Sequence, residues 1–288
     1  MITHSQILEQ QQRWAAKHKI AVDDDGYTNV LNDNLFQPLH PDTLRDFQRG
    51  SGDELGKKGR RGKMLALHSS SALAVNVFDY WRGRSLIWFE TALSLSTEPS
   101  FQGFEAQFAT GLQGTPPNLD LAFVMESGQI VAVESKFTEL YYHTKQTVPF
   151  AAAYFPSGNG LWADRSLPRC QKLARLLDQG ELKFRYLNAA QLLKHILGLS
   201  HDSMRRFTLL YLWYTIPSDE ARTHEDEVKA FSNEISSELD FRAFTYQELF
   251  SSTLRNLGVE HEAYLTYLSG RYFPEETKNN HALPDEKE

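Results

Sequence analysis

The sequence predicts one α/β domain: an α/β/α core whose central mixed sheet carries helices on both faces, with a helical N-terminal appendage. Short β-like runs punctuated by Gly and Pro fill residues 101–137 and predict three strands in a meander. Segments with helical periodicity flank these runs on both sides. The run RFTLLYLWYTI at 206–216 is apolar throughout, which is typical of a strand buried on both faces.

The composition is that of a globular protein and excludes several functional classes. The 288 residues are 41% hydrophobic and 23% charged, and their net charge is −7. This charge excludes a generic polyanion binder, so any contact with nucleic acid needs a local basic patch. The sequence has no signal-peptide core and no run apolar enough to span a membrane, and its single cysteine allows no internal disulfide. We therefore expect a cytoplasmic protein without membrane contact.

The N-terminal residues predict an appendage joined to the main domain by a loop. Residues 5–19 have the pattern of a polar helix, and a turn-rich stretch follows. Residues 50–63 are rich in Gly and basic residues and predict a flexible loop. This loop divides the chain into an appendage, residues 1–64, and a main domain, residues 65–273. Residues 274–288 predict a flexible acidic tail.

The main domain predicts strands and helices in alternation. A helix begins after Ser69, whose hydroxyl suits an N-cap, and residues 85–95 fit a helix or a strand. Ser218 caps a long helix with an apolar face, and Thr245 with Glu248 forms a capping box that opens another helix. The remaining elements are strands over 104–110, 118–125, 129–137, 206–216 and 241–244 and helices over 166–179 and 186–199.

Three charged side chains interrupt the apolar strands. In QIVAVESKF the alternation of a strand places Glu134 and Lys136 on one face. In NLDLAFVM it places Asp120 on the face opposite the large apolar side chains. Removing a charge from water costs several kcal/mol unless the charge finds a partner. Charges in such strands therefore indicate either a functional site or a buried ion pair.

The loop between these two strands decides whether Asp120 and Glu134 meet. A two-residue loop would pair Asp120 with Ser135, on the other face of the sheet. A three-residue loop over 126–128 pairs Asp120 with Glu134, and we favour it because Gly128 suits the left-handed backbone that such a loop needs. Two carboxylates about 5 Å apart repel each other unless a cation lies between them. Mg²⁺ suits this role because it binds one or two carboxylates, a backbone carbonyl and waters.

These residues carry a family resemblance. The pattern resembles the motif of the PD-(D/E)XK nuclease superfamily. It consists of Asp120, thirteen intervening residues and then Glu134-Ser135-Lys136, on two strands that follow a helix and a strand. The strings SSSALAVNVF, TPPNLDLAFV and VAVESKFTE resemble a bacterial group of restriction endonucleases within it. The resemblance covers residues 65–250 and implies a restriction-endonuclease-like core. The proline of the motif is displaced, because Pro117 precedes Asp120 by three residues.

The resemblance implies metal-dependent hydrolysis of phosphodiester bonds in DNA. Asp120, Glu134 and the carbonyl of Ser135 would hold Mg²⁺, with Mn²⁺ as a substitute. Lys136 would orient or help deprotonate the attacking water and stabilise charge on the phosphate. The structural alternative is a buried salt bridge between Glu134 and Lys136, with Asp120 at the start of a strand.

Further polar residues are candidates for auxiliary roles. Glu105 on the first strand would complete the metal's shell, or it is a solvated edge-strand residue. Glu139 would fold back toward Lys136 through a turn, although a plain surface position is favoured. Gln191, Lys194 and His195 form a polar stripe on the helix 186–199. Superfamily members carry a Gln-x-x-x-Tyr pattern on this helix, and His195 occupies the tyrosine position. The stripe would contact phosphate or order the attacking water, or it is an ordinary solvent face.

A basic loop and an acidic helix start complete the candidates. The loop has the charge density to neutralise several phosphates without reading their sequence, although a disordered solubilising loop fits equally well. Its basic residues are Lys57, Lys58, Arg60, Arg61 and Lys63. The string HEDE from His224 to Glu227 contains metal-ligand types, but its place at the start of an acidic helix favours a solvated face.

We therefore expect a Mg²⁺-dependent DNA endonuclease of the restriction or defence type. A repair or recombination nuclease is the alternative enzyme. A catalytically silent nuclease fold that binds nucleic acid is the alternative without catalysis, and the intact Asp120, Glu134 and Lys136 argue against it. Cutting both strands of a duplex usually needs two active sites, which makes a homodimer plausible although the sequence shows no interface.

Overall fold

The protein is described by a computed structural model over residues 2–141, 149–158, 160–202, 206–254 and 257–274. Its centre is a five-stranded sheet with the strand order β1-β2-β3-β4-β5. The strands are β1 Ser100–Gln107, β2 Asn118–Val124, β3 Ile130–Lys136, β4 Phe207–Trp213 and β5 Asp240–Thr245. The first three strands form an antiparallel meander, and β3, β4 and β5 are parallel. The predicted mixed sheet and its meander are confirmed.

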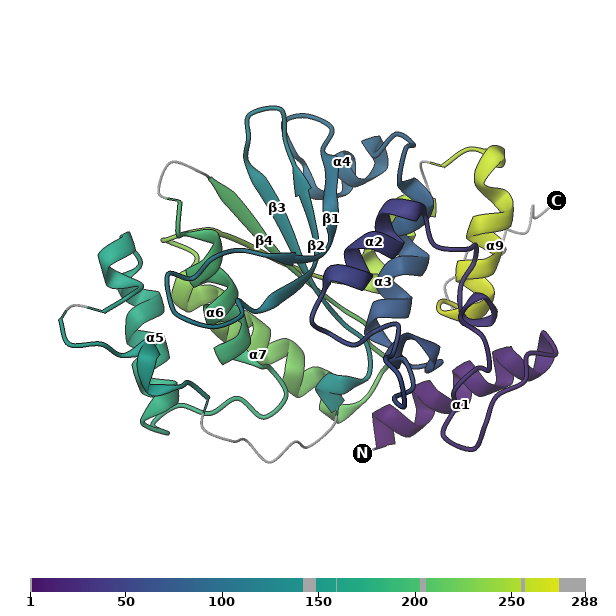
Figure 1. Ribbon diagram of the computed structural model, residues 1–288, viewed down its shortest axis with the longest axis horizontal. Helices are drawn as coiled ribbons and strands as arrows, with labels where there is room; N and C mark the ends of the chain where they lie inside the picture. Colours follow the sequence, from purple (N-terminus) through teal and green to yellow (C-terminus); the bar gives the residue numbers. More distant parts are fainter. Residues whose placement is uncertain (1, 142–148, 159, 203–205, 255–256, 275–288) are drawn as a thin grey trace, which may run out of the picture.

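Helices cover both faces of the sheet (Figure 1), as predicted. The α-helices in the described residues are α1 Ile2–Lys17, α2 Pro41–Arg49, α3 Ser70–Phe78, α4 Ile87–Leu93, α5 Pro168–Asp178, α6 Ala189–Leu199, α7 Asp219–Ile235, α8 Tyr246–Leu254 and α9 Glu262–Arg271. Figure 1 shows α5, α6 and α7 grouped on one side of the sheet and α2, α3 and α9 on the other. None of the helices in the described part of the chain is long and apolar enough to cross a membrane.

Side-chain contacts identify the two helical layers. On one face, Phe231 of α7 packs against Phe241 of β5 with ring centroids 5.2 Å apart. On the other face, Phe123 of β2 packs against Phe78 of α3 and Phe89 of α4, at 5.9 and 4.8 Å. These aromatic residues belong to one continuous core or, like the half-buried Phe241, pack against it. The burial of such large rings on both faces of the sheet stabilises the parallel strands β3 and β4 at the centre of the domain.

The N-terminal helices share this core with the main domain. Phe47 of α2 packs against Phe104 of β1 with ring centroids 5.5 Å apart, and Ile7 of α1 is fully buried in the same core. Gln11 of α1 donates from Nε2 to the carbonyl of Arg271 in α9, at 3.1 Å. Residues on both sides of the predicted boundary at 64 and 65 therefore pack together, and the boundary itself stays a prediction.

Several local predictions differ from the structure. Residues 85–95, which fitted a helix or a strand, form α4. Helix α2 was not predicted, because its N-cap is His40, whose Nδ1 accepts a hydrogen bond from Asp42 N, rather than a Ser, Thr, Asp or Asn. A single helix was predicted after Thr245, where the structure has both α8 and α9. The predicted tail 274–288 lies outside the described residues except for Pro274.

Candidate active site

The β2–β3 hairpin sets the position of the candidate carboxylates. Met125 N donates to Gln129 O at 2.9 Å and closes a three-residue loop in which Gly128 has φ +80°. The strands then pair from Val124 opposite Ile130 to Leu121 opposite Val133. One further step in this register places Asp120 opposite Glu134. The register predicted from the loop length is therefore confirmed.

The two strands separate where the carboxylates lie. The pairing of β2 with β3 ends at Val133, and the N–H of Ser135 donates instead to Asp120 Oδ2 at 2.7 Å. The carbonyl of Lys136 accepts from Tyr214 N, on the β4 side of β3. Because successive residues of a strand direct their backbone groups to opposite sides, the carbonyl of Ser135 faces the gap beside Asp120. A backbone oxygen and a carboxylate thus meet at the end of the hairpin.

Glu134 and Lys136 form a buried ion pair at this point. Lys136 Nζ lies 2.5 Å from Glu134 Oε1, and the two side chains are 13% and 1% exposed. A second acid reaches the ammonium from the turn after β3, because Glu139 Oε1 lies 4.0 Å from Lys136 Nζ. Glu139 Oε2 accepts from Phe137 N at 3.0 Å, which folds this side chain back toward β3. Glu139 is therefore more than a plain surface residue.

His195 of α6 completes the cluster from the helical layer. Its Nε2 lies 3.0 Å from Glu134 Oε2, and the residue is 1% exposed. The two side chains therefore interact directly, and among the described residues Nδ1 of His195 has no hydrogen-bond partner. The prediction that His195 contacts nucleic acid needs correction, because a fully buried ring does not reach a phosphate on the surface. His195 is instead a direct neighbour of the carboxylates.

The pKa values of the cluster follow from these contacts. Burial raises the pKa of Glu134, but Lys136 and His195 outweigh burial and lower this pKa to about 2. Burial and the charge of Glu134 raise the pKa of Asp120 well above its ordinary value. Burial lowers the pKa of Lys136, but Glu134, Glu139 and Asp120 raise it above the value of a free lysine. Lys136 and His195 thus favour the ionised form of Glu134, whereas burial and the charge of Glu134 disfavour the ionised form of Asp120.

This donor set fits a divalent cation in part. Two carboxylates and a backbone carbonyl are oxygen ligands of the kind that Mg²⁺ accepts, although both oxygens of Glu134 already face a partner, Lys136 at Oε1 and His195 at Oε2. Within the described ranges, however, no group of three or more His, Cys, Asp or Glu side chains is arranged to hold a metal ion. Any ion here would therefore rely on the backbone carbonyl and on water as well as on side chains.

A family model described as Restriction Endonuclease associating with ARP matches residues 3–273. The chain belongs to this family. The match agrees with the nuclease resemblance of the Asp120 and Glu134-Ser135-Lys136 motif, and the α/β core is compatible with a restriction-endonuclease-like fold. The match includes the residues of α1 and α2 as well as the sheet. No curated protein and no solved structure has significant similarity to this member of the family.

Glu105 does not join the cluster in this REase-ARP family member. The β1–β2 register places it opposite Asp120, but its backbone has φ +50°, and its Oε2 accepts from Asn118 Nδ2 and from Gly52 N. Burial and the nearby Glu54 raise its pKa. The predicted role of Glu105 in completing a metal shell is therefore not supported, because the left-handed backbone directs its carboxylate toward the loop at residue 52.

The remaining residues of the predicted helix stripe lie at the edge of α6. Gln191 Oε1 lies 3.4 Å from Asn188 Nδ2 at the start of the helix, one turn before His195. Lys194 Nζ lies over the rings of Phe150 and Tyr154, 5.3 and 5.6 Å from their centroids, and burial lowers its pKa. Both side chains are half-buried, so the stripe is only partly a solvent face.

The predicted basic loop is largely paired with acidic residues. Arg61 lies 2.5 Å from Asp23, and Lys63 lies 3.4 Å from Glu54. Lys57 and Arg60 both contact Asp53. Lys58 is exposed. Three acids therefore offset much of the positive charge that these side chains would present to a polyanion, and the role of the loop in nucleic-acid binding stays a prediction.

Two buried residues beside the cluster were not predicted as part of the site. Tyr211 of β4 pairs with Glu134 of β3, and its hydroxyl lies 2.9 Å from Nε2 of His224 on α7. His224 is fully buried, and this burial lowers its pKa to about 3. The interpretation of His224 as part of a solvated face is wrong. Its spacing gives the reason, because Val228 on the apolar face of the helix lies four positions after His224 and so on the same face.

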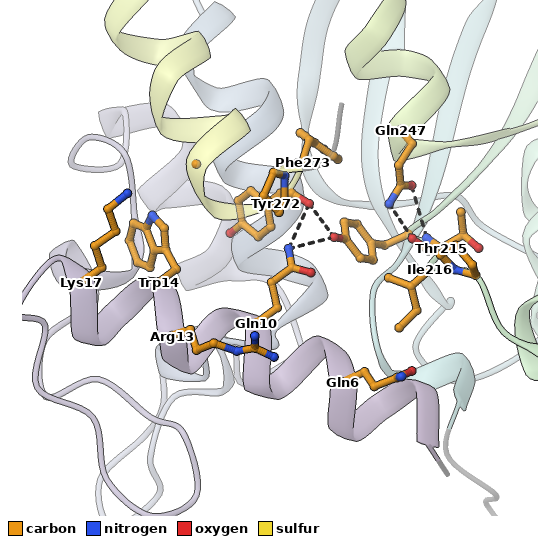
Figure 2. Close-up of a pocket in the computed structure, with 14 residues that line it drawn as sticks. Gln6, Gln10, Arg13, Trp14, Lys17, Thr215, Ile216, Gln247, Tyr272 and Phe273 are labelled. Atoms are coloured by element: carbon orange, nitrogen blue, oxygen red, sulfur yellow. Dashed lines mark hydrogen bonds between the residues drawn. The ribbon is translucent and has the colours of Figure 1, made fainter. Parts of the chain in front are cut away.

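A separate groove of about 760 Å³ lies between α1, the segment after β4 and the end of α9. Figure 2 shows Gln10 of α1 at its centre, where its Nε2 donates to Tyr214 Oη and to the carbonyl of Tyr272, each at 3.2 Å. Gln247 of α8 donates to the carbonyl of Thr215 at the far end. The groove includes none of the residues predicted for the active site.

Proposed function

We propose that this chain is a metal-dependent DNA endonuclease of the restriction type that hydrolyses phosphodiester bonds. The observation that carries the proposal is the meeting of Asp120, Glu134 and Lys136 where β2 and β3 separate, in a chain whose family is described as a restriction endonuclease. Three charges in a buried strand pair are costly to keep without a function. Their spacing matches the motif from which the nuclease resemblance was inferred.

Each residue of the cluster has a role in this proposal. Asp120, Glu134 and the carbonyl of Ser135 would hold Mg²⁺, which when bound supplies a Lewis acid and lowers the pKa of a water molecule. Lys136 stays protonated, because the surrounding carboxylates raise its pKa. We therefore assign it to the stabilisation of negative charge on the scissile phosphate rather than to deprotonation of water. Gln191 and Lys194 are proposed to contact the DNA backbone beside it.

A cleavage assay with matched variants tests the proposal. Supercoiled plasmid and linear DNA are incubated with the wild type in Mg²⁺, in Mn²⁺ and in EDTA. We expect cutting with either metal and none in EDTA. Glu134→Gln keeps the shape of the side chain but removes its charge, and we expect it to abolish cutting. Glu225→Gln is the control, because Glu225 pairs with Lys229 on the exposed side of α7.

Glu225→Gln removes one negative charge away from the site, so it shows whether a loss of charge or solubility alone reduces DNA cleavage. Both variants are first shown to have the far-UV circular dichroism and melting temperature of a folded protein. Cutting by Glu134→Gln at the wild-type rate would refute the assignment of the site. A folded wild type that leaves every DNA substrate intact in both metals would refute the proposed activity.

A further inference from the structure

We infer that Glu105 is a positioning residue for DNA binding. Its carboxylate anchors the base of the basic loop, residues 50–63, beside Asp120, and so fixes the basic side chains of the loop as contacts to the DNA backbone next to the cleavage site. This role rests on the proposed function and deepens it, because it names a surface that would hold the substrate. It differs from the metal ligation that the position of Glu105 on β1 had suggested.

Glu105 has a backbone conformation that a glutamate rarely adopts. Its φ is +50°, in the left-handed region that disfavours residues with a Cβ, although it lies within strand β1. A residue other than glycine keeps such a conformation only where its surroundings hold it there, and such residues cluster at functional sites. Here the conformation takes the carboxylate out of the alternation of β1 and directs it to the loop, where Oε2 accepts from Gly52 N at 3.3 Å.

Two glycines of the basic loop fit closely against this carboxylate. A Cβ added at Gly50 would lie 2.6 Å from Oε2 of Glu105, and one added at Gly52 would lie 3.0 Å from the same oxygen. Neither glycine has φ in the left-handed region. Contact with Glu105, rather than backbone conformation, therefore disfavours a side chain at both positions. The base of the loop is shaped to receive the carboxylate.

Asn118 of β2 joins the loop to the strand that carries Asp120. Its Nδ2 donates to the same Oε2 of Glu105 and also to Ser51 Oγ, the latter at 3.1 Å. Asn118 precedes Asp120 by two residues, so both lie on one face of the sheet, about 7 Å apart along the strand. The base of the loop is therefore held on the face where Asp120 and Glu134 meet.

Hydrogen bonds also hold the rest of the loop together. Lys63 Nζ donates to the carbonyl of Gly52 at 2.5 Å, which brings the end of the loop back to its base. Lys57 and Arg60 exchange two backbone hydrogen bonds, of 3.1 and 2.7 Å, across the turn at the tip. A loop tied at its base and at its tip carries its side chains as a unit. Its attachment to Glu105 thus decides where these side chains lie.

The charge of the loop suits a polyanion. It has five basic and two acidic side chains, so its net charge stays positive although Asp53 contacts both Lys57 and Arg60. Lys58 is exposed at the turn. Duplex DNA has a phosphate about every 3.4 Å along each strand. A duplex whose scissile phosphate lies at Asp120 would therefore bring neighbouring phosphates to a loop that is anchored on the same face.

Binding of a fluorescently labelled DNA duplex in EDTA tests this role apart from cleavage. We expect Glu105→Ala to bind about tenfold more weakly at 50 mM salt, and the slope of log affinity against log salt to fall by about 2, because phosphate contacts are lost. Loss of a carboxylate alone would have the opposite effect and strengthen binding to a polyanion. Glu126→Ala is the matched control, because it removes the same charge from an exposed glutamate after β2 and should bind at least as tightly as the wild type.

Two further variants separate the anchor from the charge of Glu105. Both hydrogen bonds end on one oxygen, so Glu105→Gln keeps an acceptor for them and should retain most of the wild-type affinity. Gly50→Ala keeps Glu105 but places a Cβ against it, and we expect about the same loss as in Glu105→Ala. Circular dichroism and the melting temperature first establish that each variant is folded. If Glu105→Ala does not fold, Gly50→Ala decides.

A double-mutant cycle connects Glu105 to the basic side chains. The variant in which Lys57, Lys58, Arg60 and Arg61 are replaced by alanine should bind DNA no more tightly than Glu105→Ala. Adding Glu105→Ala to this variant should cause no further loss, because both changes remove the same contacts. A further loss as large as in the wild-type background would show that Glu105 acts elsewhere, and would overturn the inference.

The outcomes separate this role from the proposed function. Binding by folded Glu105→Ala that equals or exceeds that of the wild type would overturn the role of Glu105. Wild-type affinity in the variant with four alanines would overturn the loop as a DNA contact and leave the cleavage site at Asp120 and Glu134 intact. A folded wild type that neither binds nor cuts DNA would overturn both proposals.

Discussion

At the scale of single residues, Lys136 offers the sharpest kinetic prediction. We expect Lys136→Met to slow single-turnover DNA cleavage by about 10²–10⁴-fold, because the variant loses a positive charge placed beside the reacting phosphate. Lys136→Arg keeps the charge and should recover part of the rate. The wild-type rate should also show no rise from lysine deprotonation between pH 7 and 9, because the neighbouring carboxylates raise the pKa of Lys136. A rise that Lys136→Met abolishes would instead identify the lysine as a base.

His224 gives a prediction for the pH dependence of stability. Burial lowers its pKa to about 3 in the folded protein, whereas the unfolded chain has the ordinary value near 6.5. Between these values the unfolded state binds the extra proton, so its population grows as the pH falls. We expect the wild type to lose about 2 kcal/mol more unfolding free energy between pH 7 and pH 5 than His224→Gln loses. Urea denaturation at both pH values measures the difference, and parallel losses would contradict the prediction.

The charged motif could be predicted from the sequence, but the histidines around it could not. Alternation within a strand fixes which side chains share a face, so Asp120, Glu134 and Lys136 could be placed together from β2 and β3 alone. His195 reaches Glu134 of β3 and His224 reaches Tyr211 of β4, each from a helix that is distant in the sequence. Their contacts depend on how α6 and α7 are rotated against the sheet, and a polar stripe of one helix does not determine that rotation.

At the scale of elements, the β2–β3 hairpin depends on Gly128. Its φ is +80°, and an added Cβ would meet no atom within 4 Å, so substitution tests backbone strain without a steric clash. We expect Gly128→Ala to lower the unfolding free energy by about 1 kcal/mol, and Gly128→Asn to cost less because Asn tolerates the left-handed region. Thermal or urea unfolding measures both variants. Equal costs for Ala and Asn would show that the loop does not hold this conformation.

Elements with strong local signals were predictable, and those without them were not. The capping box of Thr245 and Glu248 forms as predicted, with Thr245 N donating to Glu248 Oε2 and Glu248 N donating to Thr245 Oγ1. Helix α4 was ambiguous because it covers only seven residues and exposes Ile87, so its apolar pattern is too short to show a period. The direction of the Glu105 side chain could not be predicted for another reason. Its positive φ interrupts the alternation of side chains along β1.

At the scale of the whole molecule, Arg271 joins the two ends of the described chain. This arginine of α9 is fully buried, and its guanidinium donates to Gln11 Oε1 at 3.0 Å and to the carbonyl of Asn34 at 2.8 Å. It also lies over the ring of Trp14, 4.5 Å from the centroid. These partners are neutral, so the charge is stabilised by hydrogen bonds and an aromatic face rather than by a carboxylate.

We expect Arg271→Ala to lower the unfolding free energy by about 3 kcal/mol, because it leaves buried acceptors of Gln11 and Asn34 unpaired. Arg13→Ala is the control, since Arg13 is exposed and pairs with Glu9 within α1, and it should change stability by less than about 0.5 kcal/mol. Urea denaturation followed by tryptophan fluorescence measures both. A loss below 1 kcal/mol in Arg271→Ala would mean that water replaces the guanidinium at little cost.

The contacts between Arg271 and α1 can form only late in the synthesis of the chain. Roughly 250 residues separate α1 from Arg271, and a ribosome that adds about 5–20 residues per second needs roughly 10–50 s to make them. Throughout this time Trp14 and Gln11 lack the guanidinium against which they finally pack. Helix α1 is therefore synthesised well before its buried partner on α9, and these contacts form only after α9 has been made.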